Sequence, residues 1–290
     1  MKHRFHGYHR FLYYTAFMKT ISNFSSSGDA AAEGSTSQTK KQPKFDPSAL
    51  YYDMSGDKFL VIFNHYEYQK TRYFKDKRPS TRKGTDVDVK VLKELFGRLG
   101  FKIFTYTDKE YDDIIELMTE IANMDHSKTS CLVVVILTHG DKKGVVYAAD
   151  RGYLLKDVTS LLETGDIGLV NKPKIFFVQA CRGDKVDEGR TVRYDGEETL
   201  VVPSHVDFLL MQSSVDDYLS WRDLGGSWMI QELCEVIDDH HRSYDLLQLI
   251  TITTRNVAYK RASYTPSNKS THNKKQTPET CFTLTKLLKF

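Results

Sequence analysis

The sequence predicts an α/β fold in which a central, mostly parallel sheet of about six strands is flanked by helices. The first observation is that apolar runs of strand length alternate along the chain with segments whose apolar residues recur at helical spacing. The second is that residues 132–137 form a continuous apolar run rich in β-branched side chains. Such a run is typical of a parallel strand that is covered on both faces.

Each element follows from its local pattern. The apolar runs predict strands at residues 59–63, 102–106, 132–137, 175–178, 206–211 and 281–284. Helical spacing predicts one helix that ends at Gly100, and it is marked by Val91, Leu92, Leu95, Phe96 and Leu99. The same spacing marks a second helix through Ile114, Ile115, Met118 and Ile121. Three further helices are expected at 154–162, 227–238 and 244–257.

The composition excludes several classes of protein. With 40% hydrophobic residues in 290, the chain is long enough for a sizeable core, and its net charge of only +3 does not favour binding to nucleic acid. No run approaches the ~18 apolar residues that span a bilayer. The cysteines form no C-x-x-C pair, so no metal or other cofactor is expected, and isolated thiols favour a reducing, cytoplasmic location. They are Cys131, Cys181, Cys234 and Cys281.

Three segments lack the apolar residues of a folded core. Residues 1–20 are basic and free of acids, and their apolar stretch is too weak for a secretory signal, so a disordered leader is expected, with a transit peptide as the alternative. Residues 25–49 are small and polar, which predicts a flexible linker, and the folded part should begin near Tyr51. Residues 184–204 are rich in Asp, Glu, Gly and Arg and predict a long exposed loop.

Two predicted strands end at residues that carry chemistry. The run 132–137 leads into His139 and Gly140, and the run 175–178 leads into Cys181. The carboxyl ends of parallel strands share one edge, where sites form. A thiolate there attacks a peptide carbonyl, and an imidazole protonates the departing amine. Small residues on either side let backbone N–H groups approach the oxyanion, and the N–H groups of Gly140 and Cys181 are the candidates.

Taken singly, these residues are weak signals, because a lone cysteine is usually a small buried hydrophobe and a lone histidine an ordinary polar residue. The wider pattern is more specific. Residues 179–183 read Gln-Ala-Cys-Arg-Gly, with His139 upstream, and this resembles the caspase signature. The resemblance extends over roughly residues 50–290 and is closest to the short-prodomain effector (executioner) type, as found in insects. It is also carried by residues 81–88, 124–127, 137–141, 172–174, 220–222 and 226–228.

The resemblance implies a caspase-like three-layer sandwich and a cysteine endopeptidase that cuts proteins after aspartate. Cys181 would be the nucleophile and His139 its catalytic partner. Arg82 and Arg222 would clamp the substrate aspartate, a role suited to planar guanidinium groups, and Gln179 would add an amide donor. Three further residues are expected to bind the extended substrate. Ser220 and Trp221 would line the substrate strand together with Arg222, and Trp228 would serve the fourth upstream pocket or simply belong to the core.

The resemblance also implies a zymogen. Residues 1–29 would be a short leader, 30–195 a large subunit with a flexible start at 30–49, and 196–290 a small subunit that completes the pocket and the dimer interface. An upstream initiator caspase would cut after Asp195, with Asp187 as the alternative, although the acids of this loop could equally serve only solubility. A leader cut after Asp29 would expose Ala30, as in tetrapeptides that inhibitor-of-apoptosis proteins bind.

Three rival interpretations remain. A protease of the same fold that cuts after Arg, Lys or Asn would need an acidic or polar pocket, and Arg82 and Arg222 argue against it. A catalytically silent, caspase-like decoy would typically lack the cysteine or the histidine. A nucleotide-binding protein would carry a glycine-rich loop after the first strand, where this chain has Asn64 and His65 instead.

Overall fold

The structure is a computed structural model that describes residues 46, 48–182, 206–215, 220–223 and 225–290. The predicted leader, the cleavage positions Asp29 and Asp195, Ala30 and the loop 184–204 all lie outside the described residues, as does Gly183. Within the described part, no helix combines the length and the apolar character that crossing a membrane requires.

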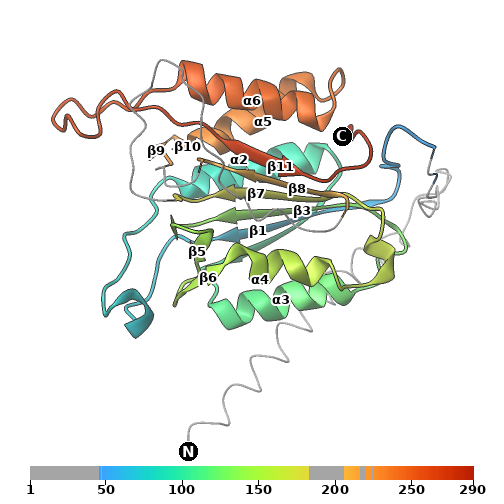
Figure 1. Ribbon diagram of the computed structural model, residues 1–290, viewed down its shortest axis with the longest axis horizontal. Helices are drawn as coiled ribbons and strands as arrows, with labels where there is room; N and C mark the ends of the chain where they lie inside the picture. Colours follow the sequence, from blue (N-terminus) through green and yellow to red (C-terminus); the bar gives the residue numbers. More distant parts are fainter. Residues whose placement is uncertain (1–45, 47, 183–205, 216–219, 224) are drawn as a thin grey trace, which may run out of the picture. The chain divides into compact units, whose positions relative to one another are not determined.

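A six-stranded sheet forms the centre of the folded part (Figure 1). Its spatial order is β11-β8-β7-β3-β1-β2, and each neighbouring pair from β2 to β8 is parallel. Only β11 runs antiparallel, along β8. The strands are β1 (Asp57–Asn64), β2 (Lys102–Thr107), β3 (Thr129–Leu137), β7 (Lys174–Gln179), β8 (Phe208–Gln212) and β11 (Glu279–Phe282). The predicted mostly parallel sheet is confirmed.

Helices cover both faces of this sheet and complete three layers (Figure 1). One face carries α2 (Thr85–Arg98), α5 (Trp228–His240) and α6 (Leu246–Lys260). The other carries α3 (Tyr111–Asn123) and α4 (Leu155–Thr159). The described residues also form short 3₁₀ turns at η1 (Arg72–Phe74), η2 (Ser160–Leu162) and η3 (Ile167–Leu169).

The helix boundaries follow from local chemistry. At the start of α6, the Asp245 carboxylate accepts hydrogen bonds from the N–H groups of Leu247 and Gln248, while the Gln248 side chain accepts from the Asp245 N–H. This reciprocal cap satisfies backbone donors that a helix otherwise leaves open. After α2, the chain turns at Gly100, whose φ of 80° is readily adopted by glycine.

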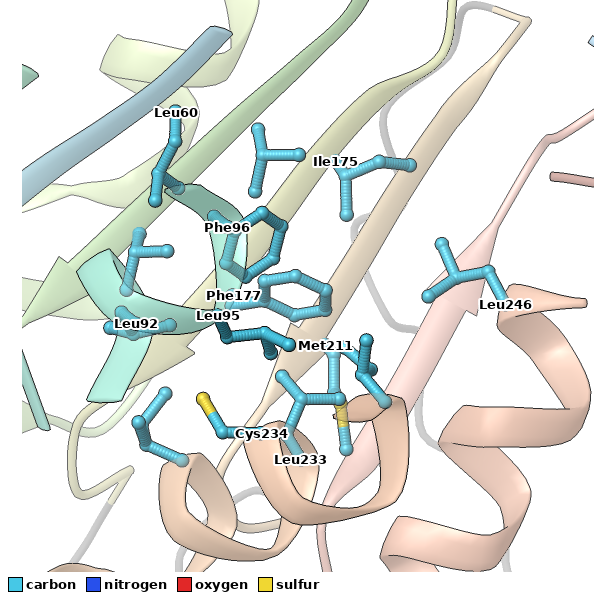
Figure 2. Packing of buried hydrophobic residues seen from close by; sticks show 14 of the residues in the cluster. Leu60, Leu92, Leu95, Phe96, Ile175, Phe177, Met211, Leu233, Cys234 and Leu246 are labelled. Carbon is cyan, nitrogen blue, oxygen red and sulfur yellow. The ribbon is translucent and has the colours of Figure 1, made fainter. Parts of the chain in front are cut away.

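The core explains why β3 reads as an unbroken apolar run. All nine residues of β3 are buried, so the side chains that point to either face of the sheet are covered. Figure 2 shows one of these layers, in which Phe177 and Met211 of the sheet face Leu95 of α2 and Leu233 of α5. The central strands are therefore held by apolar packing on both sides.

Three predicted boundaries are wrong. Strand β8 begins two residues late, because Asp207 has a left-handed backbone with φ of 67° that interrupts an extended strand. Strand β11 covers Glu279–Phe282 rather than 281–284, because its register pairs Glu279 with Gln212. The helix predicted at 154–162 is α-helical only over Leu155–Thr159 and then tightens into η2.

Two small sheets beside the main sheet were not predicted from the sequence. One contains β4 (Gly140–Asp141), β5 (Val145–Tyr147) and β6 (Gly152–Leu154), and the other pairs β9 (Arg222–Asp223) with β10 (Gly226–Ser227). Their strands have only two or three residues, which is too short for an alternating pattern to be recognised.

Candidate active site

The register of the sheet brings His139 and Cys181 to the same edge. Leu137 at the end of β3 pairs with Gln179 at the end of β7, and the Thr138 N–H donates to the Gln179 carbonyl at 3.0 Å. His139 and Cys181 therefore follow the last paired residues of adjacent parallel strands by the same two positions. The predicted juxtaposition of an imidazole and a thiol at one edge of the sheet is thus observed in the backbone.

Gly140 is in close contact with the segment that carries the thiol. A Cβ atom at Gly140 would clash with the carbonyl oxygen of Cys181 and would lie 3.0 Å from the Ala180 side chain and the Val145 carbonyl oxygen. Only glycine allows this approach. The two backbone N–H groups predicted to bind an oxyanion, those of Gly140 and Cys181, accordingly belong to segments in direct contact.

The environment of His139 defines its tautomer. Its Nε2 lies 2.7 Å from the carbonyl oxygen of Ser80 and 3.3 Å from the Ser80 hydroxyl. A carbonyl oxygen only accepts, so Nε2 carries the hydrogen and Nδ1 is left as the proton acceptor. Burial lowers the pKa of His139 to about 4, the Ser80 bond opposes that shift, and the charges of Arg82 and Arg222 add to it. The imidazole is therefore neutral at physiological pH and can act as a base.

Cys181 differs from the other three cysteines. Cys131 and Cys234 are buried in the core, and burial raises the pKa of Cys131 to about 12 and that of Cys234 further. Burial also raises the pKa of Cys281. These three thiols stay protonated at neutral pH, whereas Cys181 is half-buried at the edge that also holds a neutral imidazole.

The backbone of Ser220 rests against the thiol. Its N–H lies 3.5 Å from Cys181 Sγ, and its carbonyl oxygen lies 3.7 Å from the same sulfur. Its hydroxyl accepts a hydrogen bond from Gln179 Nε2 at 2.5 Å. Ser220 therefore contacts both the sulfur and the amide that was predicted to bind substrate.

Arg82 is the most unusual residue of this edge, because its guanidinium is fully buried. Nη1 donates to the His65 carbonyl at 3.1 Å and to Thr85 Oγ1 at 2.8 Å. Nε and Nη2 have no hydrogen-bond partner among the residues that the structure describes. Burial lowers the pKa of Arg82 to about 10, so the group is still cationic at neutral pH. A buried cation with open donors is costly unless an anion reaches it.

Gln179 and Arg222 belong to the same edge as this cation. The Gln179 side chain is buried, and its Oε1 lacks a partner among the described residues. Arg222 donates from Nε to the carbonyl of Lys83, the residue next to Arg82, at 2.8 Å. Burial is the main influence lowering the pKa of both arginines, and the nearby Cys181 opposes it in each case. The three side chains predicted to hold a carboxylate thus lie together near the sulfur.

Two tryptophans extend the site. Trp221 and Trp228 stack with ring centroids 6.0 Å apart, and the Trp228 N–H donates to the Trp221 carbonyl at 3.3 Å. Trp221 is half-buried, and Gln276 holds its N–H at 2.6 Å. Trp228 is only 6% exposed and packs against the Trp221 ring. Direct contact of either ring with a substrate remains a prediction.

Sequence reasoning missed three residues of this edge, namely His65, Tyr68 and Ser80. All three lie in the irregular segment between β1 and α2, where no periodic pattern marks a side chain as buried or exposed. Ser80 contacts His139 through a backbone carbonyl, which no residue type reveals. The burial of His65 and Tyr68 is likewise a consequence of tertiary packing.

Comparison with known proteins agrees with this geometry. The family model described as Caspase domain matches residues 57–289. A caspase-1 of Spodoptera frugiperda is 35% identical over 274 residues, covering 91% of this chain and 89% of that protein. A caspase-3 of Xenopus laevis is 38% identical over 279 residues, covering 89% of this chain and 95% of that protein.

The fold has a solved counterpart as well. The crystal structure of caspase-1 from Spodoptera frugiperda superposes with a TM-score of 0.75 at 34% sequence identity, over 87% of this chain and 96% of the other. The family model and the relatives cover the sheet, the helices on both faces and the edge that carries Cys181 and His139. This chain belongs to the caspase family and is a cysteine protease of the caspase type.

Proposed function

We propose that this protein is an effector caspase of apoptosis that cleaves proteins after aspartate, with Cys181 as nucleophile and His139 as general base and acid. One observation carries the aspartate specificity: the fully buried Arg82 guanidinium has two nitrogens without partners among the described residues, at the edge that holds the thiol. A buried cation with open, planar donors suits a carboxylate, which accepts two parallel hydrogen bonds.

The chemistry follows from the protonation states. Neutral His139 takes the proton of the Cys181 thiol through Nδ1, while the Ser80 carbonyl holds Nε2–H. The thiolate attacks the backbone carbonyl carbon of the substrate aspartate, and the oxyanion accepts from the N–H groups of Gly140 and Cys181. The imidazolium then gives its proton to the leaving amine, which breaks the C–N bond. Water hydrolyses the resulting thioester and restores the thiol.

The socket selects the carboxylate by completing bonds that are open without it. The substrate oxygens would accept from Nε and Nη2 of Arg82, from Arg222 and from the amide of Gln179. The hydrogen bond from Gln179 Nε2 to the Ser220 hydroxyl must break before this amide can donate to a substrate. The binding energy therefore comes mainly from Arg82, whose donors replace no existing hydrogen bond among the described residues.

We propose that the uncut chain is a latent zymogen. Ser220 lies against Cys181 Sγ, and the 184–204 segment joins the part that carries Cys181 to the part that carries Ser220. Cutting after Asp195 would free the Ser220 segment to move away from the sulfur and to receive a substrate strand. An upstream initiator caspase would make this cut, giving subunits of residues 30–195 and 196–290 after a further leader cut behind Asp29.

The free edge of the sheet suits a dimer of two such units. Strand β11 is the last strand of the sheet, and among the strands that the structure describes it pairs with β8 alone; its Phe282 is 49% exposed. Edge strands of this kind pair readily with another chain. Glu279 of β11 also forms an ion pair with Arg182, the neighbour of the nucleophile, so a partner at this edge would reach the active site.

Two further proposals concern the leader and the location of the protein. A leader cut behind Asp29 would expose Ala30-Ala31-Ala32-Glu33, and we propose that inhibitor-of-apoptosis proteins bind this new N-terminus. We also place the protein in the cytoplasm, because its isolated thiols favour a reducing compartment. Mass spectrometry of the active enzyme tests the first point: a large subunit that starts anywhere other than Ala30 would exclude it.

Fluorogenic tetrapeptides test the proposed function. Purified processed protein should hydrolyse peptides that end in Asp and leave matched peptides that end in Arg uncut. Expressed alone, the wild type should also process itself into two fragments that meet near Asp195, whereas Cys181→Ala should stay one chain. Cleavage after Arg, or normal self-processing by Cys181→Ala, would refute the assignment.

A further inference from the structure

Tyr68 is a buried tyrosine whose hydroxyl lies at the end of β3. The residue is only 3% exposed, although it belongs to the irregular segment after β1. Its hydroxyl oxygen lies 2.9 Å from the backbone nitrogen of His139 and 2.9 Å from Thr138 Oγ1. The backbone N–H of His139 can only donate, so the phenol oxygen is its acceptor.

The direction of the remaining bonds follows from the donors and acceptors present. Thr138 Oγ1 donates to the Tyr147 carbonyl at 2.5 Å, because that oxygen can only accept. The hydroxyl of Thr138 is thus left to accept the Tyr68 O–H. The Tyr147 N–H in turn donates to the His139 carbonyl at 2.9 Å. Tyr68, Thr138, Tyr147 and His139 therefore form a closed chain that holds both backbone polar groups of His139.

The Tyr68 ring also contacts the imidazole directly. It stacks on His139 with centroids 5.0 Å apart and planes 29° apart, and it also stacks on His65, with centroids 6.1 Å apart. Burial raises the pKa of Tyr68, so the phenol keeps its proton and donates at physiological pH. The side chain thus touches His139 by its ring and holds the backbone by its hydroxyl.

We propose that Tyr68 is a positioning residue for catalysis: its hydroxyl sets the orientation of the His139 imidazole and of the His139–Gly140 peptide whose N–H binds the oxyanion. The inference rests on the proposed function, in which His139 moves the proton and Gly140 stabilises the oxyanion. Small errors in such geometry are costly, because proton transfer and oxyanion binding both need the atoms in place before the reaction.

A phenylalanine variant separates positioning from packing. Tyr68→Phe keeps the stacked ring and removes only the hydroxyl. The matched control is Tyr153→Phe, because Tyr153 of β6 is 5% exposed and its hydroxyl has no partner among the described residues. Both changes delete one buried hydroxyl oxygen, and of these two hydroxyls only that of Tyr68 bonds to His139, so Tyr153→Phe controls for the loss of a buried oxygen by itself.

Three measurements test the proposal, all on the processed protein that is made from the full-length chain. We expect Tyr68→Phe to lower kcat for an aspartyl peptide by about ten-fold or more while KM changes less than about two-fold, since the interaction acts in the transition state. The rate of alkylation of Cys181 by iodoacetamide at alkaline pH, where hydroxide can replace His139 as the base, should stay within about two-fold of wild type. Tyr153→Phe should leave all these values near wild type.

Amide hydrogen exchange gives a readout that does not depend on activity. Without the phenol oxygen, the end of β3 should open more often, so the amides of Gly140 and Tyr147 should exchange about ten-fold faster than in wild type or Tyr153→Phe. Wild-type kcat in Tyr68→Phe, an equal loss in Tyr153→Phe, or unchanged exchange at both amides would overturn the proposal. An inactive wild type would instead refute the proposed function, and the exchange result would still decide the role of Tyr68.

Discussion

The middle of the central sheet and its carboxyl edge are both buried, but the middle buries apolar side chains and the edge buries polar ones. In the middle, every residue of β3 is buried, and its apolar side chains pack against helices on both faces. At the edge, His65, Arg82 and Gln179 are just as deeply buried, yet each has side-chain nitrogen or oxygen atoms without partners among the described residues. Burial stabilises the fold in the first region and costs free energy in the second.

This difference identifies the edge as a place where a ligand completes the structure. Unpaired buried polar groups are rare in folded proteins and usually have a functional explanation. Those of His65, Arg82 and Gln179 belong to this edge, where the cation Arg82 lies near the thiol of Cys181. The contrast predicts that substitutions in the middle of the sheet change stability, whereas substitutions at the edge change activity and leave stability intact.

The largest effect is expected at Arg82. Arg82→Met removes the buried cation, so kcat/KM for aspartyl peptides should fall by about 10³ or more, roughly 4 kcal/mol. The free energy of unfolding should stay the same or rise, because an apolar side chain replaces a charge with open donors. Steady-state kinetics and urea denaturation measure the two quantities. Arg98→Met, at an exposed ion pair with Asp238, is the control and should change neither by much.

A substitution in the middle of the sheet should have the opposite effect and change stability rather than activity. Phe177 of β7 is fully buried in the core beneath α2 and α5, so Phe177→Ala should lower the free energy of unfolding by about 3–5 kcal/mol. At a temperature where the variant is still folded, kcat/KM should be near wild type. Tyr264→Ala, at a side chain that is 83% exposed, should shift stability by less than about 0.5 kcal/mol. Equal stability losses in the two variants would contradict this picture of the core.

The middle of the sheet could be predicted from the sequence alone, whereas much of the carboxyl edge could not. Strands β1, β3 and β7 could be predicted because unbroken apolar runs report burial on both faces, and the positions of His139 and Cys181 follow from the ends of those strands. In contrast, Ser80 and Tyr68 could not be predicted. Both lie in an irregular segment, and the shorter contact of Ser80 with His139 is made by its backbone carbonyl.

The ends of strands β8 and β11 show that an apolar run does not fix where a strand begins or ends. Leu284 looked like part of the last strand, but pairing with β8 places that strand at Glu279–Phe282. An apolar run does not specify which residues of an edge strand pair, because register depends on the neighbouring strand. Likewise, the left-handed backbone of Asp207 shortens β8 although Val206 extends the apolar run.

Acid should weaken the fold through its buried imidazoles. Burial lowers the pKa of His65 to about 3 and that of His139 to about 4, and it also lowers the pKa of His126. In the unfolded chain a histidine takes up a proton near pH 6.5, whereas these folded residues stay neutral. The unfolded state therefore binds more protons below pH 6.5, and stability should fall as the pH drops from about 6.5 towards 4.

Urea denaturation at pH 7, 6 and 5 measures this dependence. Each buried imidazole contributes a slope of at most about 1.4 kcal/mol per pH unit. His65→Asn removes one of them, so the variant should lose less stability between pH 6 and 5 than the wild type, whatever its stability at pH 7. An identical slope in both proteins would mean that His65 is protonated in the folded state.

The smallest effect is expected far from the edge, at the start of α6. Asp245→Ala removes the side chain that accepts from the N–H groups of Leu247 and Gln248, which should lower the free energy of unfolding by about 1 kcal/mol. Asp245→Asn keeps an acceptor oxygen, so its free energy of unfolding should fall by only about 0.3 kcal/mol. Activity of the folded protein should not change in either variant. A loss in Asp245→Asn as large as that in Asp245→Ala would show that charge, rather than capping, is responsible.

The central claim is that the edge holds a cationic socket for one carboxylate, and a pair of peptides tests it most directly. The two peptides differ only in the residue before the cleaved bond, which is Asp in one and Asn in the other, so that shape is kept and charge is lost. The wild-type enzyme should cleave the Asp peptide with kcat/KM at least about 10³ higher, because an amide has no charge and only one acceptor oxygen to offer the buried Arg82 guanidinium. Values within about ten-fold of each other would contradict the account.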